Sequence, residues 1–122
     1  MIMPRSVAFD RPGGEPAAAG SRRPIDLVHL ARQTQGDRAV EQDVLSMFAH
    51  QAAAVRERIG PAERAERVEL AHRLAGSARA IGAFAVADCA SAIEQAPEDR
   101  AAIGRLSRLI DEARDFISAI SR

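Results

Sequence analysis

The stretch VELAHRLAGSARAIGA, residues 68–83, decides the fold. Its apolar residues recur at intervals of three and four, which places their side chains along one face of an α-helix. This stripe consists of Val68, Ala71, Leu74, Ala78 and Ile81. Gly82 follows its last member, at the position where glycine commonly ends a helix. The pattern therefore predicts a helix from about Pro61 to Ile81 with one buried face.

Four more segments have helical spacing, and none has the alternation typical of a strand. They run from about Pro24 to Gln33, Asp37 to Ile59, Ala83 to Gln95, and Glu98 or Asp99 to Ile120. Asp37 is expected to cap its helix, and Pro24 and Pro61 are expected in first turns. The side chains expected to face inward are Val40, Val44, Met47, Phe48, Val55, Ile59, Phe84, Ala87, Ala90, Ile93, Ile103, Leu106, Ile110, Ala113, Ile117 and Ile120.

The connections between these segments are a few residues long, so consecutive helices should pack antiparallel. The fold class expected is all-α: an up-down-up-down antiparallel four-helix bundle with a short additional N-terminal helix. Residues 24–122 would form this single domain. Residues 1–23 contain closely spaced prolines and glycines, which resist helix and strand alike, so we expect a disordered tail there.

The composition argues against a nucleic-acid-binding protein, a disulfide-bonded protein and a membrane-spanning protein. The 122 residues carry 17 Lys+Arg and 17 Asp+Glu, and aromatic residues make up 3 %. A net charge of zero with so few rings argues against nucleic-acid binding, which needs positive charge and stacking platforms. A single cysteine, Cys89, allows no internal disulfide and is expected to be a small buried residue. No apolar stretch is long enough to span a membrane and no secretory signal is evident, so we expect a cytoplasmic protein.

The face opposite the buried stripe carries a different line of residues. Glu69, His72, Gly76, Arg79 and Ala83 follow one another at intervals of 3, 4, 3 and 4. A glycine inside a helix costs about 1 kcal/mol relative to alanine. Beside an exposed histidine, the missing Cβ would leave the imidazole uncovered and let another molecule approach. The alternative is that Gly76 allows close packing of a neighbouring helix.

This segment resembles the signature of histidine-containing phosphotransfer (HPt) domains of bacterial phosphorelays. The matching residues are Ala71, His72, Leu74, Gly76, Ser77, Ile81, Gly82 and Ala83. The resemblance extends over about residues 24–120 and includes Ile25-Asp26, Phe48, Cys89 and Ile93-Glu94. It implies a four-helix bundle whose His72 Nε2 accepts a phosphoryl group from a receiver-domain aspartate and passes it to another receiver.

The resemblance also implies what such a protein would need from others. It would have no kinase activity and no cofactor of its own, because the receiver supplies Mg²⁺ and most catalytic groups. Its partners would be response-regulator receivers and a hybrid histidine kinase, and the simplest expectation is a monomer.

One position departs from the family pattern. The family usually has Lys three residues after the histidine, where this chain has Ala75. Arg79 lies on the His72 face about two turns away, roughly 10 Å along the axis, whereas Arg73 points about 100° away. We expect Arg79 to replace the missing Lys, because its planar fork suits phosphate. The supporting or docking residues are therefore expected to be Glu69, Arg73, Ala75, Gly76 and Arg79.

Other interpretations compete with the phosphoryl carrier. Ala75 favours a pseudo-HPt module that binds a receiver or kinase without transferring phosphate. A purely structural helical adaptor would use an apolar stripe with Leu109 and Phe116. The stretch with Arg56, Arg58, Arg64 and Arg67 alternates with glutamates and is expected to be a solvated, salt-bridged face. Of the other histidines, His50 is expected in solvent and His29 at the surface or as a cap.

Overall fold

The computed structural model describes residues 23–121, and within this range it contains helices and no strand. The helices are α2 (Leu27–Thr34), α3 (Arg38–Arg58), α4 (Arg64–Ile81), α5 (Phe84–Gln95) and α6 (Arg100–Ile120). The disordered tail expected at the N-terminus lies outside the described residues, apart from Arg23.

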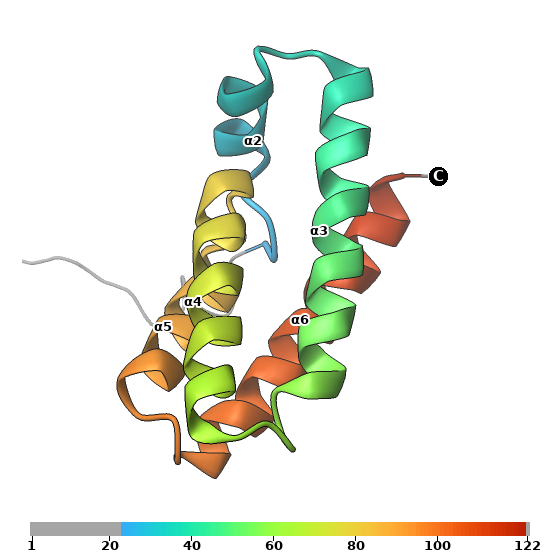
Figure 1. Ribbon diagram of the computed structural model, residues 1–122. Coiled ribbons are helices and arrows are strands. Elements are labelled where there is room, and N and C mark those ends of the chain that lie inside the picture. Colours follow the sequence, from blue (N-terminus) through green and yellow to red (C-terminus); the bar gives the residue numbers. More distant parts are fainter. Residues whose placement is uncertain (1–22, 122) are drawn as a thin grey trace, which may run out of the picture.

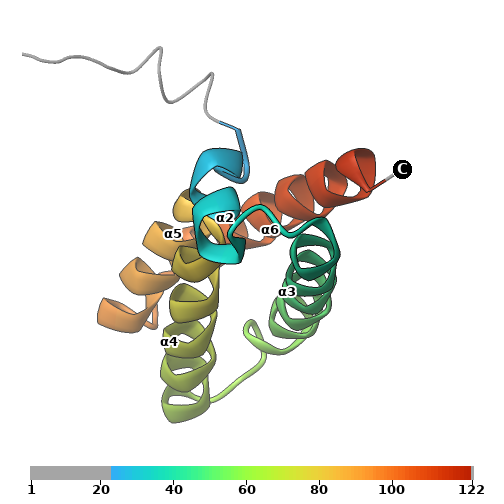
Figure 2. The same ribbon diagram turned by 90° about the horizontal axis from the view of Figure 1, so that it is seen from above.

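Helices α3 to α6 form the expected antiparallel bundle. Each runs opposite to the one before it, and α3 packs on both α4 and α6 while α5 packs on α4 and α6 (Figure 1). The short helix α2 contacts α3 and α4, and seen from above it lies over the end of α4 (Figure 2). Helix α4 therefore has α3 on one side, α5 on the other and α2 at its C-terminal end.

Aspartates begin three of the helices. Asp37 accepts a hydrogen bond from the Val40 amide at 3.1 Å, as expected, and Asp99 accepts one from the Ala102 amide at 3.1 Å. Asp26 does the same for α2, so that helix starts at Leu27 rather than near Pro24. The N-terminal expectation for α4 is also wrong, because Pro61 lies in the preceding turn. A cap of this kind contributes about 1 kcal/mol.

The inward face of α3 differs from the predicted one. The buried stripe is Leu45, Phe48, Ala52, Val55 and Ile59. Val40 and Met47 were expected inside but are 42 % and 70 % exposed, and Val44 is half-buried. These residues also obey helical spacing, but on the adjoining face of the helix. Ile120 is exposed as well, since it is the last residue of α6.

Helix α2 closes the C-terminal end of α4. Gly82 has a φ of 91° and ends α4 as expected, and its carbonyl accepts a hydrogen bond from the Asp26 amide at 2.9 Å. His29 Nε2 lies 3.1 Å from the Ala80 carbonyl oxygen, and the His29 ring packs edge-on against Phe84. Two carbonyls that α4 could not satisfy internally thus find donors on another element. His29 is therefore a cap, one of the two roles expected for it.

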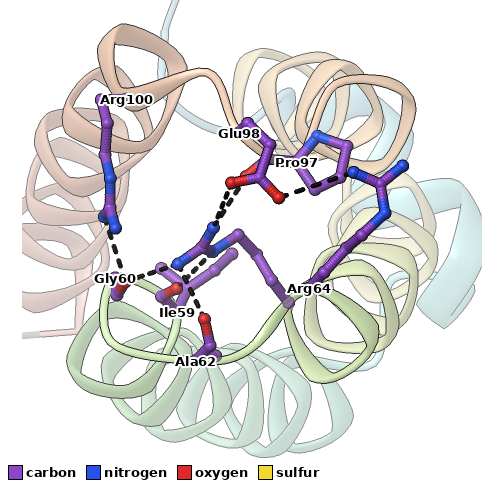
Figure 3. A network of polar contacts seen from close by, with 8 residues as sticks. Ile59, Gly60, Ala62, Arg64, Pro97, Glu98 and Arg100 are labelled. Carbon is purple, nitrogen blue, oxygen red and sulfur yellow. Dashed lines mark hydrogen bonds and ion pairs between the residues drawn. The ribbon is translucent and has the colours of Figure 1, made fainter.

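Arg67 was expected on a solvated face, but its side chain is buried, with the whole residue 3 % exposed. Its guanidinium donates to the carbonyls of four residues at 2.6 to 2.9 Å: Ile59, Gly60, Ala62 and Pro97. Figure 3 shows this network, in which Arg100 also donates to Gly60 and Glu98 lies beside both Arg64 and Arg67. The turn before α4 and the turn before α6 are thus held together by one side chain.

Candidate functional site

His72 lies in the middle of α4 with its side chain 71 % exposed. Its Nδ1 is 2.8 Å from Oε2 of Glu94, a half-buried residue near the end of α5. An ionised carboxylate can only accept hydrogen bonds, so this contact requires the ring hydrogen to be on Nδ1. In the neutral imidazole, the other ring nitrogen, Nε2, then carries the free lone pair. The neutral His72 ring thus has one nitrogen engaged by Glu94 and one available as an acceptor, on a side chain that is mostly exposed.

Gly76, one turn after His72, leaves open space on the same face. A Cβ built at this position would meet no atom within 4 Å beyond its own helix backbone. A glycine required for close helix packing would have a neighbour there, so the packing alternative is wrong. What Gly76 contributes is an uncovered stretch of helix surface beside the imidazole.

The remaining expected site residues are not all brought together. Glu69 and Arg73 form an exposed ion pair at 3.1 Å along α4. Ala75 is 2 % exposed and belongs to the bundle core, so it lies beneath the site instead of on its surface. Arg79 is exposed, and its guanidinium donates to the Ser91 hydroxyl of α5 at 2.7 Å. Arg79 therefore leans onto the same helix that carries Glu94.

An apolar groove of about 380 Å³ opens on the other side of α4, between α4 and α3. It is lined by Val44, Met47, Phe48, Gln51, Ser77, Ala80 and Ile81. Sequence reasoning missed this surface because it assigned Val44 and Met47 to the core. Helix α4 thus has the polar His72–Glu94 contact on its α5 side and the apolar groove on its α3 side.

Sequence reasoning gave Glu94 no role of its own. Its neighbour Ile93 is fully buried, which places Glu94 at the edge of the inward face of α5. Only the antiparallel pairing of α4 with α5 brings it to His72, 22 positions earlier. A carboxylate at the boundary of one helix, paired in register with a histidine on the next, is the signal that could have identified it.

The other two histidines lack this arrangement. His50 is exposed on α3 and its Nδ1 contacts the backbone carbonyl of Ser46 at 2.8 Å, whereas His29 contributes to the cap of α4. Within residues 23–121 His72 alone combines an exposed ring with a carboxylate partner.

Two further features of the described residues bear on function. No cluster of three or more His, Cys, Asp or Glu side chains in residues 23–121 could hold a metal ion. None of the helices in this range has the length and apolar character that crossing a bilayer requires.

Comparison with known proteins agrees with the geometry. A family model described as "Hpt domain" matches residues 42–121, about two thirds of the chain. No curated protein and no solved structure matches the sequence. The matched range begins within α3 and contains α4, α5 and α6, so it includes His72, Glu94 and Arg79.

Proposed function

Because this chain belongs to the Hpt domain family, whose role is phosphotransfer, we propose that it is a phosphorelay carrier that accepts a phosphoryl group on His72 Nε2. The observation that supports this proposal most is the His72–Glu94 contact, which leaves Nε2 free and exposed. The phosphoryl donor is the phosphorylated aspartate of a receiver domain, and the acceptor is the aspartate of another receiver.

In the proposed step the Nε2 lone pair forms a bond to phosphorus, and the bond from phosphorus to the aspartyl oxygen breaks. The aspartate leaves as a carboxylate with that electron pair. The His72 ring keeps its Nδ1 hydrogen and becomes a phosphorylated imidazolium, whose positive charge the Glu94 carboxylate offsets. No proton has to move, so the same changes run in reverse when the phosphoryl group passes on.

The receiver supplies the Mg²⁺ and most of the groups that stabilise the transferring phosphoryl group. The carrier contributes the nucleophile, its orientation and a surface for docking, and has no kinase activity. We place this exchange in the cytoplasm, with receivers and a hybrid histidine kinase as partners.

The groove between α3 and α4 is the second surface that a receiver would cover. A protein interface of ordinary size covers about 800 Å² per partner, a patch of roughly 16 Å radius. Ala80 lies eight residues from His72, or about 12 Å along the helix axis. A receiver centred on His72 therefore reaches the groove, and apolar side chains beside its phosphorylated aspartate would fill it.

The proposal is tested by mixing the protein with Mg²⁺ and a panel of phosphorylated receiver domains from its own genome. Acid-labile, alkali-stable phosphate should appear on the wild type and on His50→Gln, the matched exposed histidine, but not on His72→Gln. Label on His72→Gln would overturn the assignment of the acceptor. Binding to a receiver without any label on the wild type would instead establish a docking module that does not transfer phosphate.

Glu94 has its own test, which compares two variants. Glu94→Ala removes the acceptor that fixes the ring hydrogen, so the population with a free Nε2 should fall and phosphoryl uptake should slow about tenfold. Glu94→Gln keeps an oxygen that can accept from Nδ1 but loses the charge, so its uptake should lie between Glu94→Ala and the wild type. The ¹⁵N NMR shifts of His72 report the tautomer directly. An unchanged tautomer and rate in Glu94→Ala would remove Glu94 from the mechanism.

The groove is tested with Met47→Glu, which places a charge among apolar side chains. We expect more receiver to be needed for half-maximal transfer, with the maximal rate unchanged, because Met47 does not touch the reacting atoms. An unchanged concentration dependence would show that the receiver does not use this groove.

A further inference from the structure

Resting on the proposed function, we infer that Arg79, held by Ser91, is the side chain of this protein that binds the phosphoryl group on His72. A phosphoryl group on Nε2 carries negative charge, and a nearby guanidinium can donate charge-assisted hydrogen bonds to its oxygens. Three positions on α4 near His72 have to be compared: Ala75, where the family usually has Lys, and the two arginines Arg73 and Arg79.

Ala75 cannot provide it in this packing. The side chain at this position is 2 % exposed and faces the core, so a longer cationic side chain would first have to leave the bundle interior. Arg73 is exposed but ion-paired with Glu69, and it lies about 100° around the helix from His72. Arg79 remains, and the only side-chain hydrogen bond it makes to residues 23–121 is the one to Ser91.

Arg79 and His72 both contact α5, and these two contacts bear on how far apart their side chains lie. Side chains on a helix lean toward its N-terminus, which for Arg79 is the direction of His72. Ser91, which holds the guanidinium, lies three residues before Glu94, which holds the imidazole. Three residues of α5 correspond to a rise of about 4.5 Å. The α5 positions that hold the guanidinium and the imidazole are thus about one helical turn apart, whereas Arg79 and His72 are about two turns apart along α4.

Gly76 lies between these two side chains and leaves the space between them open. Apart from its chain neighbours and the backbone of its own helix, no atom lies within 4 Å of the Cβ that another residue would place there. A guanidinium has five N–H donors, and Ser91 occupies one of them. The remaining donors can reach phosphoryl oxygens over Gly76, and Ser91 acts as a positioning residue that keeps the guanidinium on the His72 side of α5.

The experiment compares Arg79→Ala with Arg73→Ala, the matched exposed arginine on the same helix. Phosphoramidate, a small phosphoryl donor whose ammonia leaves as Nε2 attacks phosphorus, labels His72 without a receiver. We expect Arg79→Ala to accept phosphate about tenfold more slowly and Arg73→Ala to change by less than twofold. Arg79→Lys should recover part of the rate, because it restores the charge without the planar fork. Ser91→Ala should slow uptake by less than Arg79→Ala does.

A spectroscopic readout separates phosphoryl binding from a structural role. On phosphorylation of the wild type, the Nε–H resonance of Arg79 should shift while that of Arg73 stays in place, and the ³¹P shift of phospho-His72 should differ in Arg79→Ala. If the wild type is labelled by receivers but Arg79→Ala takes up phosphate as fast and the Arg79 resonance does not move, this inference fails and the proposed function stands. If no receiver labels the wild type, the proposed function itself fails.

Discussion

Arg67 and His72 lie five residues apart on α4 and are treated in opposite ways by the fold. Arg67 is buried, and its donors meet four backbone carbonyls from two turns of the chain. His72 is exposed, with one ring nitrogen held by Glu94 and the other left free. Both are polar residues on one helix, yet the donors of Arg67 are used within the protein, whereas His72 has a ring nitrogen without a partner in residues 23–121.

The difference shows where this protein can tolerate change. A buried cation is stable only while its partners remain, because each lost hydrogen bond leaves a polar group without water or a donor. An exposed imidazole is hydrated either way, so its surroundings contribute to reactivity more than to stability. Substitutions at the Arg67 end should therefore affect folding, and substitutions on the His72 face should affect transfer.

The largest effect is expected from Arg67→Met. The substitution keeps an unbranched apolar stem but removes the guanidinium, which leaves the carbonyls of Ile59, Gly60, Ala62 and Pro97 without their donor. Unfolding in urea should show a loss of about 3 kcal/mol or more. Arg58→Met removes an exposed pair with Glu66 and should cost less than about 1 kcal/mol. Equal losses for the two variants would show that burial does not distinguish these arginines.

Gly82→Ala should have the next largest effect. The residue has a positive φ, and a Cβ would stand 2.9 Å from the Asp26 carbonyl oxygen. We expect a loss of about 1–3 kcal/mol and faster amide hydrogen exchange in α2, which must shift to make room. Full protection of the α2 amides in this variant would contradict the tight contact between Gly82 and Asp26.

Gly76→Ala is the counterpart on the His72 face and should change stability in the opposite direction. The added methyl group meets no neighbour, so the helix should gain about 0.5–1 kcal/mol. Transfer from a receiver should slow, because the methyl group occupies the open space beside His72. A variant that is more stable and transfers as fast as the wild type would show that this space is not used.

The smallest effect concerns a half-buried arginine, Arg56, which forms a two-point ion pair with Asp111 at 2.7 and 2.8 Å. Its hydrogen bond holds the pKa of Asp111 below the ordinary value. The contribution to stability is therefore present above about pH 4, the ordinary range for carboxylates, and is lost as pH falls through the lowered value. Urea midpoints of wild type and Asp111→Asn should differ slightly at pH 6 and converge at low pH. A difference between the two urea midpoints that persists at low pH would show that the Arg56–Asp111 ion pair does not cause it.

Much of the fold could be predicted from local signals. Asp37 as a cap, Gly82 as a helix end and the buried stripe of α4 from Ala71 to Ile81 depend on signals within one or two turns of the chain. Val68, the first residue predicted for that stripe, is only half-buried. The burial of Cys89 is also confirmed. The all-helical bundle follows from these signals together with the short connections.

The remaining features depend on contacts between segments. The arginines near Arg67 alternate with glutamates in the sequence, and nothing local reveals that one of them meets carbonyls of the turn before α6. Met47 has helical spacing but lies on a face of α3 that is next to the buried one. Which of the two faces is buried depends on where the neighbouring helices pack, and the sequence of α3 alone does not show this. Glu94 reaches His72 through the register of two helices. His72, the acceptor that we propose, could therefore be singled out from the sequence, whereas its carboxylate contact on α5 could not.

The anchoring of α4 at both ends has a consequence for the entropy of association. Arg67 fixes its first turn to the rest of the bundle, and the amide of Asp26 and the ring of His29 fix its last. The backbone that carries His72 is thus ordered before any partner arrives. A docking protein has to immobilise only exposed side chains, each at a cost of about 0.5–1.5 kcal/mol. A partner that docks on the His72 face therefore does not have to order the helix backbone, which lowers the entropic cost of association.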